Sequence, residues 1–175
     1  MGSNMKQSWV YSDPHFGHAG VTKFLRSDGT KVRPWDDPDI MTEDMIEMYN
    51  QLVKPNDRVY ILGDVVINRR CLPVLSLLNG RKVLIRGNHD IFRLDEYTPY
   101  FDDVRAYKIM PKHGVIMSHI PVHPSQLEHR WKANIHGHLH TNVLDDPRYI
   151  NVSVEQTDFK PVLLDEILDR VSKLD

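Results

Sequence analysis

The sequence contains a single cysteine, Cys71, and no long apolar run. One thiol cannot form an intramolecular disulfide, and it cannot build a cysteine-based zinc site or an iron–sulfur site. No stretch approaches the roughly 18 apolar residues of a membrane span, and Asp13 soon follows the first apolar residues, where a signal peptide would need an apolar core. A reducing cytoplasm is therefore the expected location, with no membrane association.

An excess of one charge is also lacking, because 22 basic and 24 acidic side chains give a formal net charge of -2. Such a chain does not hold nucleic acid or an anionic membrane by bulk charge, so any phosphate must be gripped locally. Repeats and glycine/serine-rich linkers are lacking as well, which predicts one domain over residues 5–175. Residues 1–4 precede a second methionine and look like an expression scar.

Short β-branched and aromatic runs alternate with helical patterns, which indicates an α/β fold. Strands are expected at residues 8–12, 58–62, 82–85, 104–109, 115–118, 133–135 and 149–154. One helix is expected to begin at Thr42 as its N-cap and to place Met45, Met48, Tyr49 and Leu52 on one face. Two further helices are expected over residues 71–78 and 162–174.

Histidine, in contrast, is plentiful, with ten residues. Five expected strands end in metal-capable side chains: Asp-Pro-His at 13–15, Gly-Asp at 63–64, Gly-Asn-His-Asp at 87–90, His at 119 and Gly-His-Leu-His at 137–140. Such side chains converge beyond the carboxyl ends of strands in helix-covered sheets. The donor set of nitrogen and oxygen suits manganese, iron, zinc or nickel. Seven ligands exceed the needs of one ion, so the pattern predicts two metals about 3.5 to 4 Å apart that share a carboxylate.

The ordered set of motifs resembles that of the calcineurin-like metallophosphoesterases, and the flanking segments look like the small single-domain members of bacteria and phages. The resemblance covers nearly the whole chain. It implies an αββα sandwich, with two mixed β-sheets flanked by helices and the dimetal centre at one edge. It also implies a cytoplasmic hydrolase of a bacterium or a phage-infected host that cleaves a P–O bond with a metal-bridging hydroxide and no covalent intermediate.

The resemblance further implies a ligand set for two divalent ions, with manganese as the expected metal and iron, nickel and zinc as the alternatives. The first metal would be held by Asp13, His15 and His140. The second would be held by Asn88, His119 and His138. The carboxylate of Asp64 would bridge both.

By the same resemblance, His89 is a catalytic residue that lies beside the phosphate and stabilises charge or protonates the leaving oxygen. Asp90 would orient the His89 ring through its other nitrogen, although an aspartate here could also cap the next helix. The protein phosphatase branch has an arginine four residues after the bridging aspartate, where this sequence has Asn68. Activity on phosphoproteins is therefore not expected.

Candidate substrate-binding residues lie outside the ligand motifs. His18 could reach the phosphate, or it could cap a helix or face solvent. Arg69 belongs to a basic stretch that could steer a polyanion or merely solvate the surface. The connections at residues 26–40 and 121–132 are the expected specificity elements, and in the first of them Trp35 either stacks on a nucleobase or plugs the core.

The expected partner is a phosphate-ester substrate, and no obligate protein partner is evident. A phosphodiesterase acting on a small nucleotide or a nucleic-acid end is the favoured function. A phosphomonoesterase, meaning a nucleotidase or a small phosphatase, is the alternative within enzymes. A metal-free scaffold that binds other proteins is the alternative outside enzymes, and metal content would separate it from both.

Overall fold

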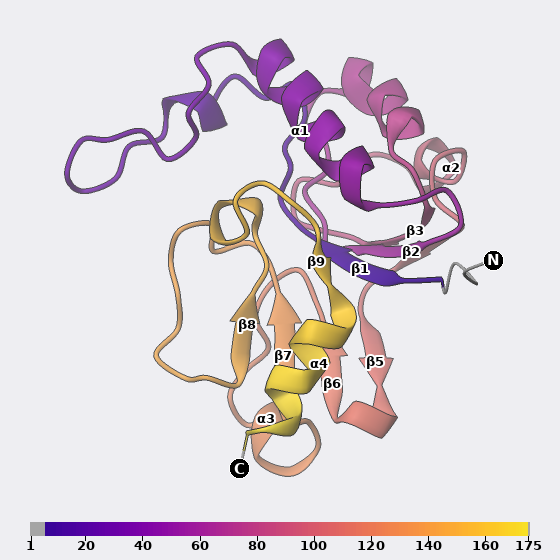
Figure 1. Ribbon diagram of the computed structural model, residues 1–175, viewed down its shortest axis with the longest axis vertical. Helices are drawn as coiled ribbons and strands as arrows, with labels where there is room; N and C mark the ends of the chain where they lie inside the picture. The colour runs from indigo at the N-terminus through magenta and orange to yellow at the C-terminus, as the bar shows by residue number, and fades with distance from the viewer. Residues whose placement is uncertain (1–5, 175) are drawn as a thin grey trace.

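The computed structural model describes residues 6–174, so the predicted expression scar at residues 1–4 lies outside the described residues. Within this range the strands form two mixed sheets flanked by helices (Figure 1), as the resemblance predicts. The first sheet has the order β4-β3-β2-β1-β9, with β1 (Ser8–Tyr11), β2 (Arg58–Ile61), β3 (Arg81–Ile85) and β4 (Asp103–Arg105) parallel and β9 (Val162–Leu163) antiparallel.

The second sheet has the order β5-β6-β7-β8 and is also mostly parallel. It consists of β5 (Lys108–Met110), β6 (Val115–Met117), β7 (Ala133–His136) and β8 (Tyr149–Asn151). Only β5 runs antiparallel to its neighbour. Because parallel strands end at the same edge, the chain segments that leave β1, β2 and β3 meet those that leave β6 and β7.

Side chains of the first sheet alternate between two hydrophobic cores, as the two-residue period of a strand requires. Trp9, Tyr11 and Ile61 lie in the first core, which also contains residues of the helices above the sheet. Val10 and Tyr60 point the other way into the second core, which they share with the second sheet and with helix α4 (Leu164–Ser172). Both faces of the first sheet are therefore covered.

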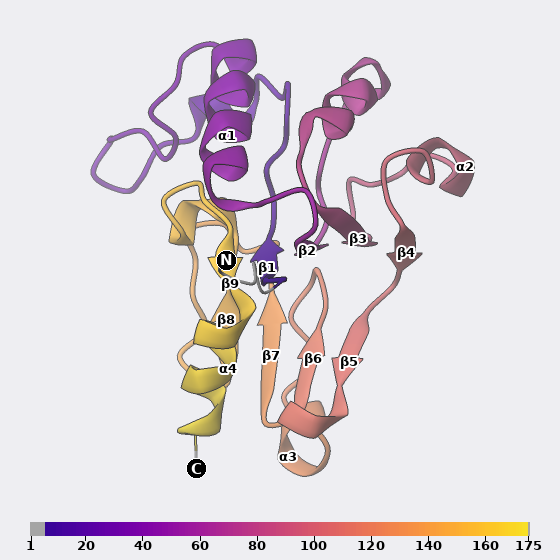
Figure 2. The same cartoon turned by 45° about the vertical axis from the view of Figure 1, so that its right-hand side comes forward.

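Helices α1 (Pro38–Leu52) and α2 (Leu94–Tyr97) lie on the outer side of the first sheet, above its strands in Figure 2. Helices α3 (Gln126–His129) and α4 (Leu164–Ser172) pack against the second sheet. Turns of 3-10 helix occur at Val21–Lys23, Arg69–Leu77, Pro111–His113 and Val154–Gln156. Among residues 6–174, no helix has the length and apolar character needed to cross a membrane.

The predicted start of the first long helix is wrong, because the helix begins five residues earlier. Asp37 is the N-cap, and its carboxylate accepts N–H bonds from Asp39 at 2.7 Å and Ile40 at 3.2 Å. Pro38 then occupies the first helical position, where its missing N–H carries no penalty. Thr42 lies one turn inside the helix, and its hydroxyl instead accepts the Gly17 N–H at 2.8 Å.

Three other elements differ from the sequence prediction. Residues 104–109 form two strands, because the chain crosses there from the first sheet to the second. Residues 162 and 163 pair with β1 before the last helix begins. The segment at 71–78 is a 3-10 helix that starts at Arg69 and contains Pro73.

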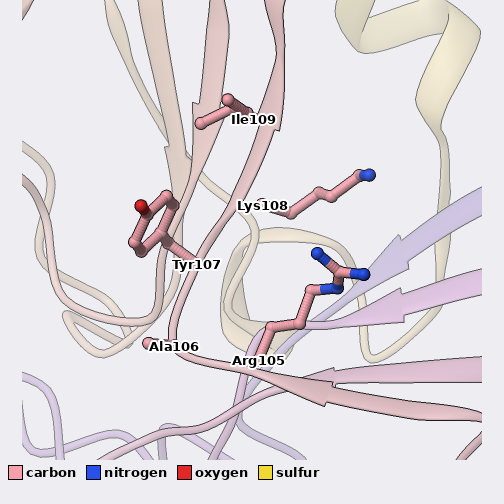
Figure 3. A pocket seen from close by; sticks show the side chains of 5 residues that line it. All are labelled: Arg105, Ala106, Tyr107, Lys108 and Ile109. Atoms are coloured by element: carbon pink, nitrogen blue, oxygen red, sulfur yellow. The ribbon is translucent and has the colours of Figure 1, made fainter.

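The crossing between the two sheets also borders a cavity. Arg105, Ala106, Tyr107, Lys108 and Ile109 line this shallow cavity of about 370 Å³ (Figure 3).

Candidate metal centre

The turns that follow the strands place the predicted ligands in an unusual backbone conformation. Five of these residues have positive φ angles of 50° to 69°, although none is a glycine: Asp13, His15, Asp64, His138 and His140. Residues other than glycine rarely adopt the left-handed backbone conformation. Those that do cluster at functional sites, where the surrounding structure holds the backbone in place. The edge of the two sheets therefore carries a concentration of strained turns.

Gly63 shows how tightly these turns pack. Its φ of 88° suits glycine, and an added Cβ would lie 2.5 Å from the backbone nitrogen of Gly87 and 2.8 Å from His119 Nδ1. The turns are also bonded to one another, since the Asp13 N–H donates to Gly63 O at 3.1 Å and the His15 N–H donates to Asp64 O at 3.1 Å. A side chain at position 63 would push these turns apart.

The turns bring six predicted ligands together as two groups of three. The first trio is Asp13, His15 and His140, and the second trio is Asp64, His119 and His138. Within each trio one donor atom per residue lies within 4.8 Å of the others, a spacing that could hold a metal ion. The seventh predicted ligand, Asn88, joins the second trio, because its Oδ1 lies 2.9 Å from His119 Nε2.

Asp64 lies between the two trios. Its Oδ2 is 3.6 Å from His15 Nε2 in the first trio and 3.4 Å from His119 Nε2 in the second. Burial alone would raise the pKa of Asp64, but the hydrogen bond and charge of His119 and the N–H of His89 lower it to about 2. An ionised carboxylate therefore faces both groups of histidines.

The first trio contains buried donor atoms that have no protein partner. Among residues 6–174, neither Asp13 Oδ1 nor either ring nitrogen of His15 makes a hydrogen bond, although all three atoms are buried. Leaving such atoms unpaired costs about 1–3 kcal/mol each. Burial and the Arg33 guanidinium hold the pKa of His15 well below its usual range, so the ring is neutral, as a metal ligand must be. A bound cation fits this donor set.

The second trio leads to the same conclusion through the tautomer of His119. Its Nδ1 lies 2.6 Å from Leu62 O, which can only accept, so Nδ1 carries a proton and Nε2 is the atom that can bind a metal. Nε2 lies 2.9 Å from Asn88 Oδ1 and 3.4 Å from Asp64 Oδ2. Burial alone would lower the pKa of His119, but the Asp64 hydrogen bond and the charges of Asp13 and Asp64 raise it, so without a metal a proton on Nε2 faces these oxygens. A divalent ion that displaces this proton would satisfy the ring nitrogen and both oxygens.

A buried ion pair that the sequence analysis missed lies behind the first trio. The side chains of Arg33 and Glu155 are both fully buried, and Arg33 Nη2 lies 2.6 Å from Glu155 Oε1. The same carboxylate oxygen accepts from His140 Nδ1 at 2.9 Å. Nothing in the local sequence marks these two residues, which lie 122 positions apart. The only signal was the presence of charged residues in a predicted loop, at 26–40, and directly after the strand predicted at 149–154.

His89 and His18 lie beside the ligands. The His89 ring is exposed, and its centroid is 5.6 Å from that of His15. The His18 ring is also 5.6 Å from His15, and its buried Nδ1 has no partner among the described residues. Burial and then the neighbouring His89 lower the pKa of His18. The structure therefore brings both predicted residues to the rim of the ligand cluster.

The predicted contact between Asp90 and the His89 ring is wrong. The Asp90 carboxylate is buried and accepts three backbone N–H bonds instead, from Gly87 at 2.7 Å, Asp64 at 2.8 Å and Val65 at 3.0 Å. These bonds tie the turn after β3 to the turn after β2. Asp90 thus supports the backbone of Asp64, because its short side chain reaches amides that the tight turn points inward.

Arg69 and Trp35 are occupied elsewhere. Arg69 pairs with Glu96 at 2.7 Å and lies over the Phe92 ring at 5.1 Å, so the structure does not direct it at the ligand cluster. The Trp35 ring packs edge-on against the Phe159 ring, with the two centroids 4.8 Å apart, and both rings cover the first core. Of the two interpretations of Trp35, the core plug is therefore correct. The aromatic ring that does lie against a ligand is Phe24, 6.2 Å from the His140 ring and 45% exposed.

Comparisons with known proteins agree with this architecture. The sequence model of the calcineurin-like phosphoesterase family matches residues 7–173. The uncharacterized protein MJ1445 of Methanocaldococcus jannaschii is 34% identical over 185 residues, which cover 97% of this chain and 94% of the relative. The solved structure of AQ665, a protein of unknown function from Aquifex aeolicus, has a TM-score of 0.70 at 26% identity and covers 93% of this chain and 97% of that chain.

A solved structure described as a novel archaeal phosphodiesterase shares the fold at a TM-score of 0.50 and 18% identity, over 84% of this chain and 83% of that chain. The family match extends over nearly all described residues and coincides with the two ligand trios. The chain belongs to the calcineurin-like phosphoesterase family. It is a metallophosphoesterase, a class of phosphoester hydrolases that use divalent metal ions.

Proposed function

We propose that this protein is a dimetal phosphodiesterase that acts on a small nucleotide or on a nucleic-acid end. The observation that carries the proposal is the position of Asp64 between two ligand trios, each of which offers its own set of donors. Asp13, His15 and His140 would hold one ion, and Asn88, His119 and His138 would hold the other, with Asp64 shared between them.

When bound, two divalent ions activate water and polarise the phosphoryl oxygens in an in-line displacement. Manganese is the metal proposed, because a donor set of carboxylate, amide oxygen and imidazole without sulfur suits it. The rest of the chemistry belongs to side chains of the protein. His89 is exposed beside His15 and can donate a proton to the leaving oxygen or stabilise its charge. His18, in contact with the same ring, is proposed to bind the phosphate.

Arg33, Arg69 and Arg86 already have partners within the protein, which supports a diester substrate over a monoester. Arg33 is bound to Glu155 and to backbone carbonyls, and Arg69 is bound to Glu96. Arg86 donates to the carbonyls of Asp90 and Phe92. A monoester phosphate carries up to two negative charges and a diester only one, so a site with its arginines committed elsewhere suits the singly charged group better.

Exposed apolar side chains around the ligands support an organic group on the substrate. Phe24 lies against His140, while Ile91 and Ile120 follow Asp90 and His119 in the sequence and are 72% and 52% exposed. The metals interact only with the phosphoryl group, so discrimination must come from groups that contact what lies beyond it. A base or a comparable ring resting on Phe24 would meet that need.

A matrix of substrates and metals tests the proposal. Purified protein is stripped of metal, reloaded with manganese, nickel, zinc or magnesium, and assayed on matched nucleotide diesters and monoesters. We expect close to two ions per chain and a higher kcat/KM on diesters in manganese. A preference for monoesters would favour the nucleotidase alternative. An absence of bound metal under metal-replete conditions would favour the binding scaffold.

The variant His89→Ala tests the role of the ring that faces the substrate. Its loss should slow the hydrolysis of esters with poor alkoxide leaving groups by about 10²- to 10⁴-fold, because these need a proton. Esters of nitrophenol, whose leaving group needs none, should be affected far less. Metal content should be unchanged, since His89 is not assigned as a ligand. Equal losses on both esters would indicate charge stabilisation instead of proton transfer.

A further inference from the structure

The two ligand trios have unequal support from buried charge. Behind the first trio, Arg33 and Glu155 form an ion pair in which both side chains are fully buried. The guanidinium makes two contacts to one carboxylate oxygen, from Nε at 2.9 Å and from Nη2 at 2.6 Å. Among residues 6–174, no comparable pair of buried charged side chains lies behind His119 or His138.

Arg33 also binds the turn that carries two ligands of the first trio. Its Nη2 donates to Asp13 O at 2.8 Å, and its Nη1 donates to Pro14 O at 2.7 Å. The residues on either side of this proline, Asp13 and His15, have φ angles of 58° and 50°. Two donors on consecutive carbonyls hold a turn in which these left-handed conformations would otherwise be unfavourable.

Glu155 holds the third ligand of the same trio. Its Oε1 accepts from His140 Nδ1 at 2.9 Å, so the proton is on Nδ1 and Nε2 is left to bind a metal. The neighbouring residue, Gln156, donates from Nε2 to the backbone oxygen of His140 at 2.8 Å. The ring and the backbone of His140 are thus both held by one short segment of the chain.

The free energy of burying an ion pair bears on why Arg33 and Glu155 lie at this position. Removing two charges from water costs several kcal/mol per ion, and well-packed apolar residues often replace such a pair without loss of stability. Stability alone therefore gives little reason to place Arg33 and Glu155 here. Geometry gives a better one, because the pair contacts both segments that supply the first trio, the turn at 13–15 and His140.

We propose that the Arg33–Glu155 pair positions the ligands of the first metal specifically, and that the affinity of the second trio does not depend on it. This inference rests on the dimetal assignment made above. Partners that orient a metal-binding histidine typically contribute about 10- to 100-fold to metal affinity. The pair should therefore affect one metal site and not the other.

Two single-site parents separate the trios. His138→Ala keeps the first trio intact, and His140→Ala keeps the second. Glu155→Asp is added to each parent, because aspartate retains a charge for Arg33 but is too short to reach His140. Manganese binding to each metal-free protein is measured by equilibrium dialysis. We expect affinity to fall about 10- to 100-fold in the His138→Ala background and to stay unchanged in the His140→Ala background.

The controls keep the outcomes distinct. Glu155→Gln retains the length of the side chain without its charge and serves as the second variant if Glu155→Asp does not fold. Asp146→Asn removes the partly exposed pair with Arg148 and should alter neither site. Melting curves of the metal-free proteins report folding independently of metal.

Equal losses of affinity in both backgrounds, or none in either, would overturn the positioning role. Failure of both Glu155 variants to fold would overturn it as well, since the pair would then be a folding element. A different result, in which neither parent binds manganese, would count against the dimetal assignment itself.

Discussion

The two ligand trios use the same kinds of residue, one aspartate and two histidines each, but different parts of the chain support them. Behind the second trio, Asp90 binds the backbone N–H groups of Gly87, Asp64 and Val65, and Leu62 O holds His119. These supports lie in or beside the ligand motifs. The first trio depends on Arg33 and Glu155, which belong to no ligand motif. One site is thus supported largely by its own turns and the other by distant side chains.

Asp64→Ala should have the largest effect, because Asp64 is the one ligand that faces both trios. The variant is expected to lose most bound metal and nearly all activity while it remains folded. Elemental analysis and circular dichroism check this result. His15→Ala, which removes a ligand of the first trio alone, should retain more metal. If Asp64→Ala kept two ions and a near-normal rate, the shared-ligand assignment would be wrong.

Asp90→Ala should destabilise the protein by about 4 kcal/mol, because three buried N–H donors would lose their acceptor and each costs about 1–3 kcal/mol. Urea denaturation of the metal-free protein measures this loss. Asp95→Ala is the matched control, since it removes an exposed carboxylate paired with Arg93 and should cost less than about 1 kcal/mol. Similar losses in the two variants would show that backbone support by Asp90 is unimportant.

Acid should weaken the support of the first trio. Burial would raise the pKa of Glu155, but the His140 hydrogen bond and the Arg33 charge lower it from 4.5 to about 2. A depressed folded pKa contributes stability above the unfolded value, here about 3 kcal/mol, and this contribution is lost as the pH falls from about 4.5 toward 2.

Urea denaturation between pH 5 and pH 2 should therefore show a steeper loss of stability in the metal-free parent than in Glu155→Gln. The depressed pKa of Asp64 acts in both proteins, so the comparison isolates Glu155. Parallel pH profiles of the two proteins would contradict the prediction.

Phe24→Ala should have the smallest effect, about 1–2 kcal/mol of transition-state stabilisation on nucleotide diesters and almost none on a small diester without a ring. The side chain is 45% exposed, so the melting temperature should change little. Leu77→Ala is the control, because Leu77 is an apolar residue with 57% exposure that belongs to neither trio nor the proposed substrate contacts. Equal kinetic losses on both substrates would exclude stacking on Phe24.

Much of the molecule follows from local patterns. The ligand motifs could be located because each follows an apolar strand, and the carboxyl ends of parallel strands meet at one edge. The prediction for Asp90 was wrong in one respect. The sequence located Asp90 in a ligand motif, but it did not indicate which groups its carboxylate would bind. The sequence contains Gly-Asn-His-Asp whether the carboxylate turns toward the His89 ring or toward the amides beneath it, and only the packing of the Gly63 and Gly87 turns decides between them.

The sequence by itself determined which residues could bind metal and the class of fold that gathers them, because these properties depend on residue type and on periodicity within a few positions. Tertiary structure alone decided that Arg33 meets Glu155, that Arg69 turns to Glu96, and that Phe24 rather than Trp35 lies beside a ligand. Contacts between segments that lie far apart in the sequence, from 27 residues for Arg69 and Glu96 to 122 for Arg33 and Glu155, depend on how the loops pack over the sheet, and no local pattern encodes that packing.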